Sequence, residues 1–355
     1  MLRQLARLTH PVPGAGPEAL AIAVYASGDD TLPPAADKGY EGVACVDDAA
    51  RALELVSELY VRTRQPWALR WARGLMEFLL WMEAEPGRWH NFITGWDGTR
   101  NEEGPTSYSG STFWTARAWL ALARCAQNMH DDRASAAALR ALAVARDSKV
   151  APDVRCIQIL ALLCMGAQAD PGRKLLARWA NEIKVLERDG ICLNYPEEEL
   201  PPHIWGHIQE GVLALCSEIL NDRSMLALAA SSADKLIRPL IEGNFSLPSV
   251  QPYSVACTIF SCQQLERATH DPVYGMLVKK AQAWFDGPDP SMPAIYDRRL
   301  GRVADGVDNG RVNAGSGAES NIMAGLALID ELETTCTAMG LDALLPAVAS
   351  ATPPA

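Results

Sequence analysis

Hydrophobic residues recur at helical spacing along most of this chain. Between residues 46 and 64, Ala49, Leu53, Val56 and Leu59 fall close to the period of an α-helix. The same pattern predicts about twelve helices in the whole sequence. Their residue ranges are 17–26, 46–64, 66–85, 111–129, 131–148, 153–166, 171–188, 204–220, 223–241, 252–269, 272–285 and 318–339.

Two long stretches, 87–110 and 286–315, interrupt the helical pattern. The first contains RWHNFITGWDG and the second contains IYDRRLGRVADG. Each of these segments has strand-forming residues on both sides of a turn, so each predicts a short β-hairpin. Beyond residue 341 the chain is rich in Ala and Pro, which predicts a loose tail over residues 342–355.

The predicted helices alternate in character. One set is apolar nearly all round, whereas the helices between them, such as 66–85 and 171–188, carry more charge. A helix that is apolar on all sides is buried, and an amphipathic helix covers it. Strict alternation with short connections therefore predicts six helical hairpins closed into a ring. The apolar set begins near Val46, Ser111, Asp153, Ile204, Ser254 and Ala318.

The expected fold class is thus all-α, an (α/α)6 toroid with short β-hairpins in the loops at its mouth. It would form a single domain over residues 1–341. An open stack of helix pairs is the alternative. The sequence shows no fixed-period repeat, which favours the closed ring.

Composition excludes several classes of function. The net charge of −11 argues against nucleic acid as a partner, because phosphate binding needs a basic surface. No apolar window is long enough for a membrane span, and the first residues make a poor signal peptide, so we expect a cytoplasmic protein. The nine Cys show no CxxC spacing and are expected to be reduced and buried. We therefore expect no metal and no cofactor, while the oligomeric state is left open.

Candidate chemistry gathers at the starts of the apolar helices and in the two long loops. In a ring, these would meet at one carboxylate-rich and aromatic-rich mouth. Aromatic faces stack on sugar rings, and two carboxylates can act as acid and base, or as acid and nucleophile. The candidate catalytic carboxylates are Glu319, Asp47, Asp48, Glu210 and Asp97. The candidate substrate-binding residues are Trp89, His90, Asn91, Trp96, Tyr108, Trp114, His207, Tyr296, Asp297, Asp305 and Asn313.

Each candidate also has a purely structural interpretation. Glu319 follows a Gly/Ser turn and lies in the first turn of the last helix, where the helix dipole favours a negative charge. Asp47 and Asp48 precede Arg51 by four and three residues, a spacing that favours local ion pairs. His207 and Glu210 are three residues apart, and a buried hydrogen bond is a simpler expectation than a metal site. Trp89 and Trp96 could pack across a hairpin.

Four segments resemble those of a bacterial family in the six-hairpin glycosidase superfamily. They are GYEGVACVDDAARAL (39–53), RWHNFITGWDG (88–98), ARAWLALA (116–123) and the stretch from IYDRRLGRVADG to VNAGSGAES (295–320). Members of this family stand alone or follow a glycosyltransferase domain. The resemblance covers the first third and the last sixth of the chain. It implies a carbohydrate ligand more strongly than it implies a particular reaction.

The resemblance also places family motif positions on individual residues. These are Asp47, Asp48, Arg51, Arg88, Asn91, Phe92, Tyr296, Asp297, Asp305, Gly306, Asn313 and Glu319. One departure concerns Phe113, which stands about where the family has an acidic residue. This loss leaves Asp97, Glu102 or Glu103 to supply a second carboxylate, or makes the protein a non-hydrolytic relative.

The first hypothesis is therefore a glycoside hydrolase acting on an oligosaccharide. The second is a sugar epimerase or isomerase, in which His207 or His90 would abstract a proton beside a carbonyl group. The third is a non-catalytic glycan-binding protein. A terpene-cyclase-like barrel ranks last, because only the Asp47-Asp48 pair points to it and no second acidic metal motif accompanies that pair.

Overall fold

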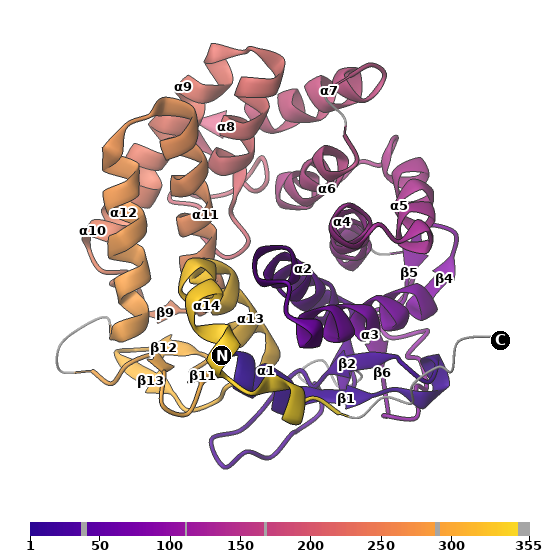
Figure 1. Cartoon of the computed structure of the whole chain (residues 1–355). Coiled ribbons are helices and arrows are strands. Elements are labelled where there is room, and N and C mark those ends of the chain that lie inside the picture. Colours follow the sequence, from indigo (N-terminus) through magenta and orange to yellow (C-terminus); the bar gives the residue numbers. More distant parts are fainter. Residues whose placement is uncertain (37–40, 111, 167–168, 288–291, 347–355) are drawn as a thin grey trace. The chain divides into compact units, whose positions relative to one another are not determined.

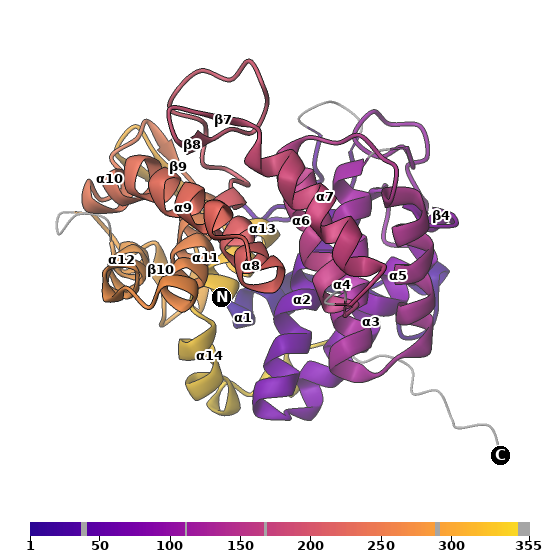
Figure 2. The same ribbon diagram turned by 90° about the horizontal axis from the view of Figure 1, so that it is seen from above.

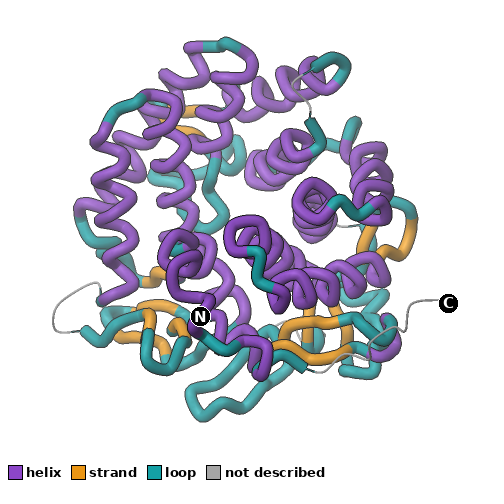
Figure 3. The backbone as a smooth tube through the Cα atoms, in the orientation of Figure 1, coloured by secondary structure: helices purple, strands orange, loops and turns teal. Residues whose placement is uncertain are grey.

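A computed structural model describes residues 1–36, 41–110, 112–166, 169–287 and 292–346. Within these ranges helices predominate, and the strands are only two or three residues long (Figure 3). The chain divides into two compact units. Unit 1 comprises Met1–Asp147, Asp297–Asp305 and Ala314–Ala355, and unit 2 comprises Ser148–Tyr296 and Gly306–Asn313. The single domain over residues 1–341 stays a prediction, and residues 347–355 of the predicted tail lie outside the described ranges.

Unit 1 is built around α2, which packs against α3, α4 and α13 (Figure 1). Helix α4 also packs against α5, and α1 packs against α13. The helices are α1 (Leu2–Leu8), α2 (Val46–Thr63), α3 (Pro66–Met82), α4 (Thr112–Met129), α5 (Asp132–Ala145), α13 (Ala318–Ala327) and α14 (Ile329–Thr335). The strands are β1 (Thr9–Pro11), β2 (Leu20–Ile22), β3 (Ala44–Cys45), β4 (Glu83–Glu85), β5 (Arg88–Trp89), β6 (Phe92–Ile93) and β11 (Arg302–Val303).

Unit 2 contains helical hairpins in which α6 packs on α7, α8 on α9 and α11 on α12 (Figure 2). The helices are α6 (Pro152–Cys164), α7 (Gly172–Lys184), α8 (Gln209–Leu220), α9 (Arg223–Ser232), the π-helical turn η2 (Ala233–Ile237), α10 (Arg238–Glu242), α11 (Pro252–Thr269) and α12 (Pro272–Ala283). The strands are β7 (Glu187–Arg188), β8 (Ile191–Cys192), β9 (Ser249–Val250), β12 (Gly306–Asp308) and β13 (Arg311–Asn313).

The helix ends follow from local sequence chemistry. Pro66 occupies the first turn of α3, where its missing N–H costs no hydrogen bond. Asp131 caps α5 by accepting hydrogen bonds from the N–H groups of Arg133 and Ala134. Helix α2 ends at Arg64, which adopts a left-handed conformation with φ 55°.

The alternation of buried and covering helices is confirmed for most pairs. Helices α2, α4, α6, α8, α11 and α13 are mostly buried, whereas α5, α7, α9 and α12 each bury one stripe. Among the covering helices, α3 is the exception, since more than one stripe of it is buried. Strand β2 packs on this helix and adds to its burial.

The predicted helix over 17–26 is wrong. Residues Leu20–Ile22 form β2, which pairs antiparallel with β1. This short segment is apolar on both faces, and such a run cannot be told from a buried helix by its period. A helix at Leu2–Leu8 was not predicted either.

Several other predictions need correction. The end of the helix expected over 66–85 forms β4, and the end of the helix expected over 171–188 forms β7. The helix expected from Ile204 begins at Gln209, because Gly206 has a positive φ of 73° that a helix does not accommodate. The last helix is interrupted at Leu328. The strands of the 88–98 segment do not pair with each other: β5 pairs with β4, and β6 pairs with β3. Ser111, the expected start of a helix that the structure begins at Thr112, lies outside the described residues.

The predicted hairpin near residue 300 is confirmed, since β10 (Tyr296–Asp297) pairs with β11. Within the described ranges the cysteines are free, and all but Cys164 are buried. No helix in these ranges is long and apolar enough to cross a membrane.

Gly74 tests the packing of α3 against the amino-terminal strand. A Cβ at this position would lie 2.5 Å from Leu20 Cδ1 and 2.9 Å from the Glu18 carbonyl oxygen. We expect Gly74→Ala to lower the free energy of unfolding by about 1–3 kcal/mol, because overpacking outweighs the helix propensity of Ala. Urea denaturation measures this change.

Gly275→Ala in α12 is the matched control. Its Cβ would meet the exposed carboxylate end of Glu266, which can move away. We expect this variant to be neutral or more stable by up to about 1 kcal/mol. Equal effects of the two substitutions would contradict the close packing of β2 on α3.

Candidate functional site

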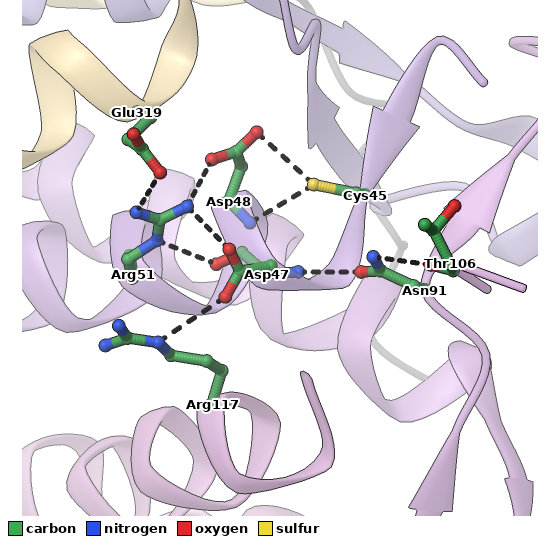
Figure 4. A network of polar contacts seen from close by, with 8 residues as sticks. All are labelled: Cys45, Asp47, Asp48, Arg51, Asn91, Thr106, Arg117 and Glu319. Carbon is green, nitrogen blue, oxygen red and sulfur yellow. Dashed lines mark hydrogen bonds and ion pairs between the residues drawn. The ribbon is translucent and has the colours of Figure 1, made fainter. Parts of the chain in front are cut away.

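A cluster of carboxyl groups surrounds Arg51 in the first turns of α2 (Figure 4). Arg51 is only 2% exposed. Its Nη2 lies 2.7 Å from Asp47 Oδ2 and 2.8 Å from Asp48 Oδ1, and its Nη1 lies 2.9 Å from Glu319 Oε2. All four residues belong to unit 1. Three of the five predicted catalytic carboxylates therefore contact the same buried guanidinium group, that of Arg51.

The local fold fixes Asp47 and Asp48. They precede Arg51 by four and three residues, so all three side chains share one face of α2. The Cys45 Sγ caps the helix by accepting a hydrogen bond from the Asp48 N–H at 3.4 Å, and the Cys45 thiol donates to Asp48 Oδ2 at 3.3 Å. The ion pairs with Arg51 that the spacing predicted are confirmed.

Asn91 connects this helix start to the following loop. Its Oδ1 accepts a hydrogen bond from the Asp47 N–H at 3.2 Å, and its Nδ2 donates to the Thr106 carbonyl oxygen at 3.0 Å (Figure 4). The side chain is buried and both ends of its amide are engaged. Asn91 thus supports the cluster, and its predicted substrate contact stays a prediction.

Glu319 reaches Arg51 from α13, at the far end of the sequence. The helix begins after Gly317, as predicted, and Glu319 lies in its first turn. The Asp305 carboxylate accepts a hydrogen bond from the Gly317 N–H at 2.8 Å, which holds the turn in place. Burial raises the pKa of Asp305, although this hydrogen bond opposes the shift. Glu319 remains 33% exposed in its side chain, so it is accessible to a ligand.

The sequence analysis missed Arg117, which extends from α4 toward Asp47 (Figure 4). Its Nε lies 3.4 Å from Asp47 Oδ1, and its guanidinium carbon lies 5.5 Å from the centre of the Phe113 ring. A usable signal was present, because an Arg in a helix that is otherwise apolar all round needs a buried partner. Phe113, at the position where the resemblance implies an acid, thus packs against this arginine.

The protonation of Asp48 differs from that of an ordinary carboxyl group. Burial raises the pKa of Asp48 to about 7, even though Arg51 acts in the opposite direction. The nearby charges of Asp47 and Glu319 raise this pKa further. A carboxyl group that titrates near neutral pH can serve as a proton donor.

The predicted aromatic platform is only partly supported. Trp89 is completely buried and donates its indole N–H to the Leu79 carbonyl oxygen at 2.8 Å, so it is a core residue and its predicted stacking role is wrong. Trp114 is also buried and donates to the Trp89 carbonyl oxygen. Tyr108, by contrast, is 47% exposed and contacts Trp114 edge-on, with 5.7 Å between ring centres. Trp96 is half-buried against His10.

Several other candidates stabilise turns. Asp97 is exposed and accepts hydrogen bonds from the backbone and the hydroxyl group of Thr99, which lower its pKa. Asp297 accepts a hydrogen bond from the Leu300 N–H at 2.9 Å. An exposed carboxylate with a lowered pKa is a poor general acid, so Asp97 does not fit the acid of the predicted carboxylate pair.

Two further candidates, His90 and Tyr296, are buried. The His90 Nδ1 lies 3.3 Å from the Ser107 carbonyl oxygen. Since a carbonyl oxygen only accepts, Nδ1 is the donor in this contact. Tyr296 is a core residue of the β10–β11 hairpin, so its predicted substrate contact is not supported.

In unit 2, His207 and Glu210 form the buried hydrogen bond that their spacing favoured. The His207 Nε2 lies 2.9 Å from Glu210 Oε1, and Nδ1 lies 2.9 Å from Asn194 Oδ1. Ser232 also donates to Glu210 Oε1, at 2.5 Å. Burial alone would raise the pKa of Glu210, but the contacts with His207 and Ser232 hold it below its usual value.

These contacts correct two predicted roles. Glu210 is completely buried and stays ionised, so it does not fit a general acid. His207 is buried with both ring nitrogens facing oxygen atoms, so it does not fit an accessible base. Asn313, also in unit 2, is exposed and donates a hydrogen bond to Asp308. Among the described residues no group of three or more His, Cys, Asp and Glu side chains could hold a metal ion.

Comparison with solved structures identifies similar folds. A D-mannose isomerase has a TM-score of 0.69 at 12% identity, covering 94% of this chain and 95% of that one. The cellobiose 2-epimerase of Spirochaeta thermophila has a TM-score of 0.64 at 15% identity, covering 94% and 93%. The GH76 α-mannanase of Bacteroides thetaiotaomicron has a TM-score of 0.56 at 9% identity, covering 83% and 88%.

The fold class is thus all-α, the (α/α)6 toroid fold that the helix alternation predicted. No family model matches the sequence, and no curated protein matches it. At such low identities the structural likeness establishes the fold alone.

The raised pKa of Asp48 predicts a pH-dependent stability difference. The native state keeps the Asp48 proton up to about pH 7, whereas the unfolded chain loses it near pH 3.8. The stability that this proton contributes is therefore complete below pH 3.8 and is lost as the pH rises toward 7. As the pH rises through this window, the free energy of unfolding of Asp48→Asn should increase relative to that of wild type by on the order of 1 kcal/mol per pH unit.

Urea denaturation of both proteins between about pH 5 and pH 8 measures the difference. Asp131→Asn is the control. Burial acts to raise the pKa of Asp131, but Arg133 and the first N–H groups of α5 lower it overall. The difference in free energy of unfolding between Asp131→Asn and wild type should therefore stay constant over that pH range. If the difference in free energy of unfolding between Asp48→Asn and wild type is also independent of pH, Asp48 is already ionised at acidic pH.

Proposed function

We propose that this protein is a carbohydrate-active enzyme, a glycoside hydrolase whose site is the cluster around Arg51. The observation that carries the proposal is the meeting of Asp47, Asp48 and Glu319 on one buried guanidinium group. Hydrolysis of a glycosidic bond needs one protonated and one ionised carboxyl group beside the bond. The likeness to folds of sugar-converting enzymes supports the same class of substrate.

Different environments give the carboxyl groups different roles. Glu319 pairs with Arg51 and is one-third exposed, so we assign it as the base or nucleophile. Asp48, with its pKa of about 7, is the carboxyl group that holds a proton near neutral pH, and we assign it as the acid. It is buried, and catalytic hydrogen bonds often form only in the complex with substrate.

Asp47 and Arg117 would bind the sugar. The Asp47 side chain is partly exposed, but its Oδ1 is buried and, within the described residues, makes no hydrogen bond beyond the 3.4 Å ion pair with Arg117 Nε. This oxygen could accept a hydrogen bond from a sugar hydroxyl group once substrate binding opens access to it. The exposed ring of Tyr108, from the same unit, offers an aromatic face for a sugar ring.

Sugar epimerisation or isomerisation is the second candidate. It is favoured by the likeness to a D-mannose isomerase and a cellobiose 2-epimerase. The base would be His90 through Nε2, since its Nδ1 faces the Ser107 carbonyl oxygen and both ring nitrogens of His207 face oxygen atoms. His90 is the residue before Asn91 in the sequence. The Asn91 side chain accepts a hydrogen bond from the Asp47 N–H, so His90 is one residue away from a group that contacts the cluster.

Glu319→Gln tests the proposed site directly. The protein is incubated with a panel of gluco-, manno-, galacto- and xylo-oligosaccharides, and new reducing ends are counted while NMR identifies isomerised products. We expect the variant to lose at least about 100-fold in hydrolytic rate, because it removes the charge of the base or nucleophile. Its free energy of unfolding should fall by no more than about 1 kcal/mol, since the side chain is partly exposed.

Glu333→Gln is the matched control. Glu333 also pairs with an arginine of α2, with its Oε2 3.0 Å from Arg62 Nη1, but this pair is exposed at the other end of the helix. Glu333→Gln should keep full activity. Full activity of Glu319→Gln would remove Glu319 from the site, and isomerised sugar without new reducing ends would replace hydrolysis by the second candidate.

A further inference from the structure

Unit 2 contains a cavity whose lining shares no residue with the Arg51 cluster. Its volume is about 510 Å³, and it lies between the loop before α8, the segment from η2 through α10, and the start of α11. Trp205 and Leu247 line it and are 38% and 37% exposed. Cavities of about 300–1,000 Å³ are the size that small ligands occupy.

A second part of the lining is polar. Ser254, Gln251 and Ser249 form a hydrogen-bonded row, in which the Gln251 Nε2 donates to Ser249 Oγ at 2.9 Å. Ser249 then donates to Asp308 Oδ1 at 2.6 Å, and Asn313 donates to Asp308 Oδ2 at 3.3 Å. Because Ser249 of β9 stands opposite Asp308 of β12, the backbone pairing of the two strands fixes this row.

Trp205 is held in place from two sides. Its ring contacts Tyr253 edge-on, with 4.9 Å between ring centres. The preceding loop is anchored by the buried carboxylate of Glu198, which accepts hydrogen bonds from the Asn194 backbone N–H at 2.6 Å and side-chain amide at 2.7 Å, and from the His203 N–H at 3.3 Å. A rigid aromatic side chain binds a ligand at little cost in conformational entropy.

We propose that this cavity binds a neutral oligosaccharide segment. A sugar ring combines an apolar C–H face with a rim of hydroxyl groups, which matches the exposed indole of Trp205 and the polar row from Ser254 to Asp308. Lys235 in the lining and Asp308 beside it have opposite charges, which suits an uncharged ligand. A purely apolar ligand would remove the polar row from water without replacing its hydrogen bonds.

The class of ligand rests on the proposed function, but the site itself can be tested without any turnover. Binding of neutral gluco-, manno-, galacto- and xylo-hexaoses is followed by NMR of the tryptophan indole N–H signals in the full chain. The Trp205 signal is assigned from its absence in Trp205→Phe. We expect at least one hexaose to shift this signal, and Trp205→Ala to weaken that binding at least tenfold.

Tyr195→Ala is the matched control, because Tyr195 is a similarly exposed aromatic residue of unit 2, 49% exposed, outside this cavity. It should bind the hexaose as wild type does. Gln251→Ala is the second test variant, since it interrupts the polar row without removing the Trp205–Tyr253 contact, and it should weaken binding at least threefold. Thermal unfolding checks that each variant is folded.

The outcomes separate this proposal from the proposed function. Trp205-dependent binding without any turnover supports the cavity site and contradicts the hydrolase. Turnover that Glu319→Gln abolishes, with no hexaose shifting the Trp205 signal, overturns the cavity site and leaves the hydrolase. Unchanged binding in Trp205→Ala also overturns it. Trp205-dependent binding of the dye 1-anilinonaphthalene-8-sulfonate, with no response to any hexaose, would assign the cavity to an apolar ligand instead.

Discussion

The buried charge of Arg51 is the constraint on which the organisation of unit 1 depends. A guanidinium group removed from water is costly unless carboxylates and hydrogen bonds compensate it. Here the compensation comes from Asp47 and Asp48 on the same helix and from Glu319 on α13. The Arg51 charge therefore joins the beginning of the first long helix to the last part of the chain, and it offsets part of the repulsion among the acidic groups gathered around it.

The same arrangement gives the cluster chemical asymmetry. Asp48 is enclosed by Cys45 and Arg51, while Asp47 and Glu319 keep partial exposure. Burial raises the pKa of Asp48 to about 7. Carboxyl groups in such different environments can hold and accept protons at the same pH, which acid–base catalysis requires.

Local spacing predicted the contacts that lie within one helix or one turn. The pairs Asp47–Arg51 and Asp48–Arg51 follow from helical periodicity. The His207–Glu210 pair, three residues apart, is also present, although His207 precedes the first residue of α8. The contact of Glu319 with Arg51 joins residues 268 positions apart, so spacing could not supply it. The resemblance to a known family pointed to both ends of that contact without giving its geometry.

Burial was the property that the sequence determined least well. Trp89 and Trp205 have the same side chain, yet the first is a core residue and the second lines an open cavity. Asn91 was expected at a binding surface because amides bind sugars, but its amide is used by the Asp47 N–H and Thr106. Such outcomes depend on tertiary packing, which a polar or aromatic residue type does not specify.

The measurement that tests the central claim most directly is a crystal structure of Glu319→Gln soaked with the saccharide that binds it most tightly. We expect a sugar ring beside the first turns of α2 and α13, with hydroxyl or glycosidic oxygens within about 3.2 Å of the Asp47 carboxylate and of the side chain at position 319. A saccharide bound elsewhere, with the Arg51 cluster unchanged and uncontacted, would contradict it.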